Sequence, residues 1–140
     1  MKVKPKGKKK SISQLKKAAD AVYSQYIRMS AVDPQTGLAR CVSCGVEKNY
    51  KELQNGHYET RKTLSLRYDE RNCHPQCVGC NVFKKGNYPR YATWMVETYG
   101  PDILRELEEE AKILVHDSRS LYEDIISEYK AKVQALQNNE

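Results

Sequence analysis

The chain has 140 residues, of which 39% are hydrophobic, and its mean hydropathy is −0.79. This length predicts one domain, or a small domain with appendages, and a single Phe and a single Trp predict a modest core that a structural metal would help to stabilise. No apolar run approaches the roughly 20 residues that span a bilayer, and no hydrophobic segment follows the basic N-terminus. We therefore expect no membrane span, no secretory signal and a cytoplasmic location.

The net charge of +6 is distributed unevenly along the chain. Residues 101–140 carry ten acidic and five basic side chains, so the excess of Lys and Arg lies in residues 1–100. A basic portion of this kind predicts a polyanionic partner. Nucleic acid is favoured over an anionic membrane surface, because the chain offers no basic amphipathic helix with an aromatic insertion face.

The N-terminal part is predicted to be a basic arm followed by a helix. Residues 1–10 contain six lysines and are expected to be a disordered arm, either a phosphate-binding segment or a solubilising tail. Residues 11–31 show apolar side chains at helical spacing, which predicts an amphipathic helix. Ser11 or Ser13 would cap its start, and the turn-forming residues 33–37 would end it.

The middle of the chain is predicted to hold short strands. Residues 38–50 fit a strand and a first cysteine pair, and residues 51–72 fit two strands around a loop. The second of these two strands rests on an alternation of apolar and polar residues, with Leu64, Leu66 and Tyr68 on one face.

Helices are predicted for the remainder. Residues 78–85 fit a short helix, and residues 89–99 fit another that Gly100 ends. Residues 101–140 show two apolar stripes at helical spacing, the second behind a capping box at Ser120–Glu123. These stripes fit a helical hairpin folded onto the same chain, or a helical interface between subunits.

Four cysteines have the spacing of a structural zinc site. Cys41-x-x-Cys44 and Cys77-x-x-Cys80 can supply four thiolates to one tetrahedral ion, and in a reducing compartment such pairs are more often metal ligands than disulfides. A closed four-cysteine site is structural, so we expect this zinc to take no part in catalysis. The fifth cysteine, Cys73, is expected to be a buried small side chain near the site.

A second group of residues has the chemistry of a phosphodiester hydrolase. His57 lies between the two cysteine pairs, and Asn81 directly follows the last cysteine. Such a hydrolase needs a base to deprotonate water and a divalent cation to stabilise charge on the phosphate. Histidine suits the base because its pKa is near neutral, and an amide oxygen can bind Mg²⁺ or Mn²⁺.

Several sequence runs resemble the phage lambda NinG (Rap) recombination protein family, which belongs to the HNH, or ββα-metal, endonucleases. The resemblance covers roughly residues 12–110. The runs that carry it are the helix end at Tyr26–Arg28, the first cysteine pair, Gly56–Tyr58, Leu66–Glu70 and, most specifically, Asn72–Asn81.

The resemblance implies an α+β fold: a small zinc-stabilised ββα-metal (HNH) module within residues 11–100, flanked by the N-terminal helix and the C-terminal helical hairpin. It implies that His57, late in the first strand, is the general base. It implies that Asn81 is a ligand of the catalytic metal and that Asn72 braces the loop between hairpin and helix. The final His of the motif is replaced by Asn81, as in the phage junction resolvase called recombination endonuclease VII, which favours branched DNA as substrate.

One position departs from the family pattern. Many HNH enzymes have an acidic residue directly before the base, where it serves as the second metal ligand, whereas this chain has Gly56. The metal would then be held by Asn81 together with a backbone carbonyl, Asn55, His74 or water. For His74 a hydrogen bond that stabilises the cysteine pair is the alternative. Weak metal binding or an inactive protein are the other interpretations.

Basic and aromatic residues in or beside the module fit a DNA-binding surface. Arg can bind phosphate bidentately and Lys acts as a point charge, while aromatic rings can stack on unpaired bases. The basic residues are Arg61, Lys62, Arg67, Lys84, Lys85 and Arg90; the aromatic ones are Tyr58, Tyr88, Tyr91 and Trp94, of which the last two are expected to pack in the core.

Three functions are therefore open on sequence grounds. The first is a metal-dependent endonuclease that hydrolyses branched recombination intermediates, of Holliday junction or D-loop type, with structural Zn²⁺ and catalytic Mg²⁺ or Mn²⁺. The second is a zinc-stabilised DNA-binding protein with a degenerate HNH fold. The third is an adaptor whose acidic residues 101–140 recruit another recombination protein. Resolution of a four-way junction needs two cuts, which favours a homodimer.

Overall fold

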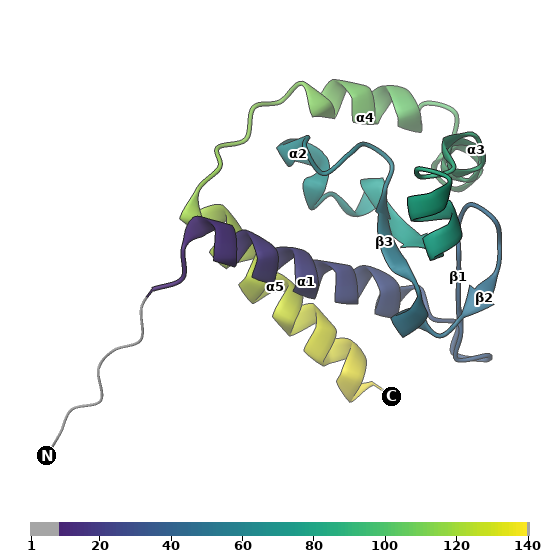
Figure 1. Cartoon of the computed structure of the whole chain (residues 1–140), viewed down its shortest axis with the longest axis horizontal. Coiled ribbons are helices and arrows are strands. Elements are labelled where there is room, and N and C mark those ends of the chain that lie inside the picture. The colour runs from purple at the N-terminus through teal and green to yellow at the C-terminus, as the bar shows by residue number, and fades with distance from the viewer. Residues whose placement is uncertain (1–8, 140) are drawn as a thin grey trace, which may run out of the picture.

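The computed structural model describes residues 9–139, so nearly all of the predicted basic arm lies outside the described residues. The elements in chain order are α1 (Ile12–Ser30), β1 (Ala39–Arg40), β2 (Glu47–Lys48), η1 (Tyr50–Glu52), β3 (Gln54–His57), α2 (Leu64–Arg67), η2 (Glu70–Asn72), β4 (Cys73–Gln76), η3 (Gly79–Phe83), α3 (Tyr88–Tyr99), α4 (Ile103–Ala111) and α5 (Arg119–Asn138). The β3–β4 pair lies between helices, and the β1–β2 pair lies at one edge of the molecule (Figure 1).

The predicted N-terminal helix is confirmed as α1. Ser11 caps it, because its side chain accepts a hydrogen bond from the Gln14 backbone N–H while the Gln14 side chain accepts one from the Ser11 N–H. Its buried residues recur at helical spacing and face the sheet and α5. The helix therefore positions its adjacent polar residues along one wall of the candidate site.

Two antiparallel strand pairs form the β structure. β1 pairs with β2 and holds the first cysteine pair, and β3 pairs with β4. In the second pair Gly56 lies opposite His74, and His57 lies opposite Cys73. Pro75 fits β4 because this strand has a neighbour on one side only, so the missing N–H interrupts no second ladder.

The predicted strand through residues 64–68 is wrong. This segment is the one-turn helix α2, and the partner of β3 is instead β4, the segment that runs into the second cysteine pair. Over five residues, alternating apolar side chains cannot distinguish a strand from a single helical turn. Leu66 is fully buried, and it packs against residues of α3 and α4.

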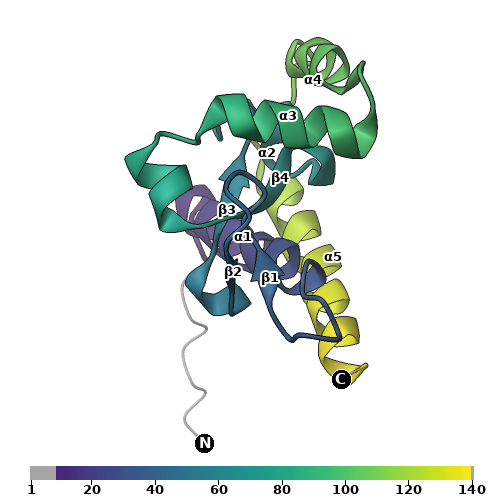
Figure 2. The same ribbon diagram turned by 90° about the vertical axis from the view of Figure 1, so that its right-hand side faces the viewer.

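Helices cover both sides of the β3–β4 pair. α1 packs against β3 and β4 on one side, with α5 lying alongside α1, and α2, α3 and α4 pack together on the other side (Figures 1 and 2). On the first side Tyr23, Ile27, Cys73 and Tyr129 form a buried cluster. The core is thus divided into small clusters around the strands rather than gathered in one centre.

The two C-terminal helices are present as predicted, but the hairpin prediction is wrong. α4 packs against α2 and α3, whereas α5 packs along α1, and residues 112–118 between them are not helical (Figure 2). α5 is capped by Ser118, not by the predicted box that begins at Ser120. An amphipathic stripe predicts that a face is buried but not which element covers it.

Candidate metal centre and histidine cleft

The four predicted cysteine ligands converge on one point. The Sγ atoms of Cys41, Cys44, Cys77 and Cys80 all lie within 4.8 Å of one another, and Cys44 and Cys77 are 3.7 Å apart. Zn–S bonds of about 2.3 Å in a tetrahedron separate sulfurs by about 3.8 Å. This arrangement can hold a metal such as zinc, as predicted from the spacing.

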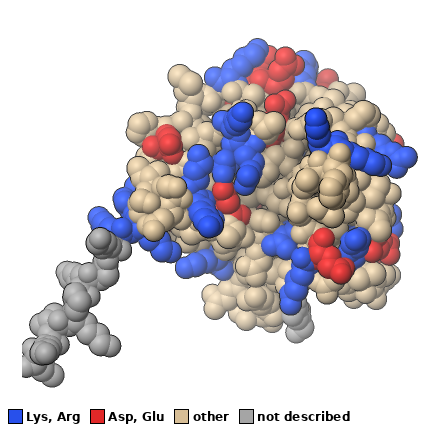
Figure 3. Space-filling view, in the orientation of Figure 1, with Lys and Arg blue, Asp and Glu red and all other residues tan. Residues whose placement is uncertain are grey.

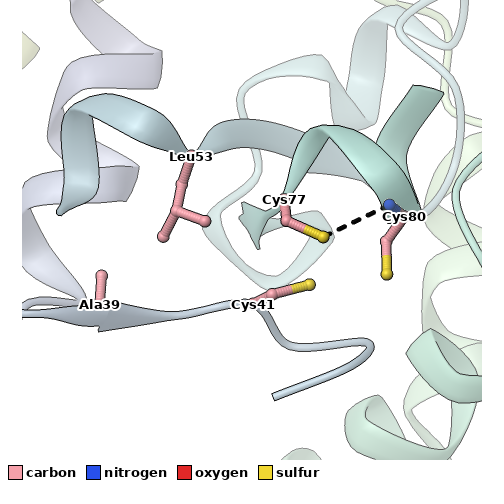
Figure 4. Packing of buried hydrophobic residues seen from close by; sticks show 5 residues of the cluster. All are labelled: Ala39, Cys41, Leu53, Cys77 and Cys80. Atoms are coloured by element: carbon pink, nitrogen blue, oxygen red, sulfur yellow. Dashed lines mark hydrogen bonds between the residues drawn. The ribbon is translucent and has the colours of Figure 1, made fainter. Parts of the chain in front are cut away.

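Local backbone geometry positions the cysteines. The Gly45 N–H donates to the Cys41 carbonyl in the tight turn between β1 and β2, where Gly45 has a φ of 81°. Figure 4 shows the sulfurs of Cys41, Cys77 and Cys80 turned toward one another, with the Cys80 backbone N–H donating to Cys77 Sγ at 3.4 Å. Leu53 and Ala39 close the apolar side of the site.

Backbone N–H groups stabilise negative charge on the sulfur of Cys41. Burial raises the pKa of the Cys41 thiol, but N–H groups of Ser43, Cys44 and Cys77 outweigh it and lower the pKa to about 7. The Asn87 side-chain amide also donates to Cys80 Sγ, at 3.4 Å. Such donors are typical partners of thiolates that bind metal.

Cys73 is buried, as predicted, but does not belong to the metal centre. It is 1% exposed and packs beneath α1 with Tyr23, Ile27 and Tyr129. Burial raises the pKa of its thiol to about 12, so Cys73 stays a neutral thiol that packs as a small apolar side chain.

An open cleft of about 660 Å³ lies between α1, β3 and η3. It brings together His57 and Asn81, which are far apart in the sequence, and adds polar side chains from α1. Its lining residues are Asp20, Tyr23, Ser24, Arg28, Leu53, Gln54, Asn55, His57, Thr60, Arg61, Asn81, Val82 and Tyr88.

His57 is held in one orientation at the end of β3. Its Nε2 lies 3.0 Å from the backbone carbonyl oxygen of Arg67, and a carbonyl can only accept, so Nε2 carries the proton. The neutral ring therefore keeps Nδ1 free to accept one. Burial lowers the pKa of His57, and the nearby charges of Arg61 and Arg67 lower it further, so the neutral form predominates near pH 7.

Two amide oxygens in the cleft are available to a cation. Asn81 Nδ2 donates to Gln54 Oε1 at 2.8 Å, which leaves Asn81 Oδ1 free to act as a ligand. Asn55 Oδ1 is buried and has no hydrogen-bond partner within the described residues. Amide oxygens are hard donors of the kind that Mg²⁺ and Mn²⁺ accept.

The structure explains why position 56 carries no acidic side chain. A Cβ at Gly56 would lie 2.0 Å from Gln76 Oε1, because the Gln76 side chain crosses β3 at this point. Gln76 is fully buried and donates to Ser43 Oγ and to the Gly86 carbonyl. A carboxylate at position 56 would have to displace this side chain.

Asn72 braces the loop between β3 and β4, and not the predicted loop between the hairpin and the following helix. Its Oδ1 accepts from the Glu59 N–H at 2.8 Å, and its Nδ2 donates to the carbonyls of Glu59 and Leu66. It is fully buried and does not line the cleft. The structure thus gives Asn72 a supporting position, not contact with a substrate.

His74 is not placed in the cleft. It lines a separate cavity behind the strand pair, where its Nδ1 lies 2.9 Å from the Tyr91 hydroxyl and its Nε2 lies 2.7 Å from the Tyr99 hydroxyl. Burial lowers the pKa of His74 to about 4. With both nitrogens engaged, the prediction of His74 as a metal ligand is wrong, and its hydrogen bonds tie β4 to α3 rather than to the cysteine pair.

The predicted DNA-binding residues divide into two groups. Arg67 is buried in an ion pair with Asp20 and donates to the Arg61 carbonyl, so its side chain is not available to DNA. The others are exposed around the cleft and η3, and basic side chains outnumber acidic ones on the face seen in Figure 3. These exposed residues are Arg61, Lys62, Lys84, Lys85 and Arg90.

The aromatic residues follow the same division. Tyr91 is fully buried, as expected, and its hydroxyl donates to the Gly56 carbonyl at 2.7 Å. Trp94 packs edge-on against His74, with ring centroids 4.5 Å apart. Tyr58 and Tyr88 pack edge to face beside the cleft, and only Tyr88 lines it.

Asp20 is a cleft residue that the sequence pattern did not single out. It is the only carboxylate among the residues that line the cleft, and it binds Arg67, Tyr68 and, at 4.0 Å, Arg61. In the sequence, Asp20 is distinguished only by its position in α1 beside the buried Ala19, at the border of the apolar face. One acidic residue in a helix is usually solvated, so the pattern alone gave no reason to select it.

The fold and the site together define a small α+β protein with a four-cysteine centre able to hold a metal, beside a cleft that contains a histidine. No helix within residues 9–139 has the length and apolar character needed to cross a membrane. The chain belongs to the NinG family: residues 1–140 match the family described as bacteriophage lambda NinG protein.

Curated relatives support this assignment. The chain is 40% identical to the NinG protein of Salmonella phage P22 over 51% of its own length and 36% of the relative. It is 33% identical to the NinG protein of Escherichia phage 933W and 31% identical to that of phage lambda, over 71% of the chain and 49% and 48% of those relatives. The chain thus matches half or less of each relative's length. No solved structure matches it.

Proposed function

We propose that the cleft between α1, β3 and η3 is the active site of a metal-dependent endonuclease of the HNH (ββα-metal) type, acting on branched DNA. The observation that carries this proposal is that His57 and Asn81 line one cleft, on a strand pair and the helical turn that follows it. This is the arrangement expected from the resemblance to HNH enzymes.

The chemistry of the cleft suits phosphodiester hydrolysis. His57 Nδ1 is the free base of a neutral ring whose other nitrogen is fixed by the Arg67 carbonyl, so it can take a proton from an attacking water. Water would attack opposite the 3′ oxygen and leave 5′-phosphate and 3′-hydroxyl ends. Arg61, exposed beside His57, can bind the phosphate.

A divalent cation, Mg²⁺ or Mn²⁺, fits the oxygen donors of this cleft. Asn81 Oδ1 and the unpaired Asn55 Oδ1 would hold it, with water completing its shell. When bound, it would stabilise charge on the phosphate and on the leaving oxygen. The zinc at the four cysteines would fix the base of η3, and so the position of Asn81.

A second candidate is a DNA-binding protein without nuclease activity. It is favoured by Gly56, where Gln76 occupies the space of the acidic ligand, and by the engagement of the cleft carboxylate, Asp20, with Arg67. In either function we place the protein in the bacterial cytoplasm with branched or partly single-stranded DNA as its ligand. We also propose that the protein acts as a homodimer and that residues 101–140 recruit another recombination protein.

A nicking assay separates the two candidates. Labelled four-way junction and linear duplex are incubated with wild type, His57→Ala and His116→Ala, with Mg²⁺, with Mn²⁺ or without added divalent cation. The proposal expects metal-dependent cutting of the junction that His57→Ala abolishes while junction binding is retained. His116 is an exposed histidine outside the cleft, so His116→Ala should cut like wild type. Tight binding without cutting under any metal selects the second candidate.

A further inference from the structure

The end of η3 exposes apolar side chains at the rim of the cleft. Phe83 is 79% exposed and Val82 is 52% exposed, although large apolar residues are usually buried. Val82 lines the cleft, and Phe83 lies two residues after Asn81. Phe83 follows Val82 directly on the helical segment η3 that borders the cleft, but its own side chain is not among those that line it.

The backbone behind Phe83 is fixed. Lys85, Gly86 and Asn87 all have positive φ, and the Gly86 N–H donates to the Cys80 carbonyl at 2.8 Å. Gln76 donates to the Gly86 carbonyl, and the Asn87 amide donates to Cys80 Sγ. These hydrogen bonds fix the turn after Phe83 to the cysteine centre. Phe83 is therefore exposed next to a well-supported turn and not on an unsupported loop.

The stretch of chain around Phe83 is positively charged. Residues 71–96 contain no Asp or Glu, and Lys84, Lys85 and Arg90 in this range are exposed. Arg61, on the loop after β3, adds a cation at the cleft. An exposed aromatic ring on a basic stretch of chain suits a polyanion with stacked rings, which is DNA, better than an apolar protein partner.

We propose that Phe83 is a wedge that inserts between bases next to the cleft and opens the stack there. The substrate class that this favours is DNA in which one step is already poorly stacked, such as a junction branch point, a bulge or a mismatch, because less unstacking free energy must be supplied. The inference rests on the proposed function only in taking DNA as the ligand. It holds for a nuclease and for a binding protein alike.

Binding without cleavage tests the wedge. The DNA is a duplex with one bulged nucleotide and 2-aminopurine beside it, compared with the fully paired duplex, in buffer without added divalent cation. Wild type should bind the bulged duplex more tightly and raise 2-aminopurine fluorescence. Phe83→Ala should weaken binding to the bulged duplex about tenfold, as expected for one lost base–aromatic stack, with little change for paired duplex and no fluorescence rise. Phe83→Trp should restore both signals.

Two control variants separate the wedge from other roles. Leu114 is 98% exposed, and Leu114→Ala should behave as wild type. Lys84→Ala should weaken binding to both duplexes alike and lower the salt dependence by about one phosphate contact. Equal binding and equal fluorescence in Phe83→Ala and wild type overturn the inference, as does a change in oligomeric state without a change in DNA binding, which marks a protein interface.

The inference and the proposed function can fail separately. Metal-dependent cutting by a Phe83→Ala variant that still unstacks the bulge would overturn the wedge and leave the nuclease. Unstacking that depends on Phe83, in a protein that cuts under no metal, would support the wedge and overturn the nuclease.

Discussion

The Asp20–Arg67 ion pair links α1 to the segment that holds His57, the histidine of the cleft. Removal of this ion pair should lower the stability of the protein and disturb the orientation of the His57 ring. Arg67 Nε donates to Asp20 Oδ1 at 2.9 Å, Nη2 donates to Oδ2, and the Tyr68 hydroxyl also donates to Oδ1. The Arg67 side chain is 10% exposed and that of Asp20 is 24% exposed. The carbonyl that fixes His57 belongs to the same Arg67.

Asp20→Asn leaves the Arg67 guanidinium nearly buried without a counter-charge. Loss of one partner of a buried pair costs about 3–5 kcal/mol, and the partial exposure of Asp20 places the expected value at the lower end, about 3 kcal/mol. Urea unfolding followed by far-UV circular dichroism measures this value. The proposed cleavage rate should fall as well, because the carbonyl that holds His57 loses its support.

The control is an ion pair on the surface. Arg40 and Glu47 lie 2.6 Å apart with side chains 68% and 43% exposed, so Glu47→Gln should cost less than about 1 kcal/mol. The double variant Asp20→Ala with Arg67→Met should recover most of the lost stability, because no unpaired charge remains. If Asp20→Asn costs no more than Glu47→Gln, the argument that this pair anchors the cleft is refuted.

Three further predictions concern the metal centre, His74 and Gly56. The purified protein should contain one zinc per chain by atomic emission, Cys77→Ser should lose it and Cys73→Ser should keep it; full zinc in Cys77→Ser would contradict the four-cysteine site. Burial lowers the pKa of His74 from its usual 6.5 to about 4, so between these two pH values the unfolded chain binds a proton that the folded protein does not. The free energy of unfolding should therefore fall by about 3 kcal/mol as the pH drops from about 6.5 to 4. His74→Gln should remove this part of the slope in urea titrations at several pH values, and an unchanged slope would refute the burial argument. Gly56→Ala should destabilise the protein by about 1–3 kcal/mol because its Cβ would displace Gln76, and Gly56→Ala with Gln76→Ala should be less destabilised than expected from adding the two single effects. Additive effects in that pair would show that Gln76 is not the obstacle.

The metal centre and α1 could be predicted from residue type and spacing alone. Two Cys-x-x-Cys pairs have few uses in such a chain, and the four sulfurs do converge. α1 has a long apolar stripe and a serine cap, which local rules describe well. His57 and Asn81 were selected through the resemblance, and the structure places both in one cleft.

The errors came from contacts between distant segments. His74 has the chemistry of a metal ligand, but the hydroxyls of Tyr91 and Tyr99 occupy both of its nitrogens, and the sequence does not show that α3 packs there. Arg67 was predicted to be a surface cation, but its side chain is nearly buried and forms an ion pair with Asp20, which is far away in the sequence. The two C-terminal stripes are real, but which element covers each is decided by the tertiary fold.

Single-turnover cleavage of a labelled four-way junction tests most directly whether His57 activates water in the cleft. Wild type and His57→Ala are compared at protein concentrations that saturate the DNA, with Mn²⁺ and without added divalent cation, across pH 5 to 8. We predict Mn²⁺-dependent cutting by wild type that rises with pH and levels off below pH 6.5, because burial lowers the pKa of His57, and no cutting by His57→Ala. Equal cutting by His57→Ala and wild type would contradict the account.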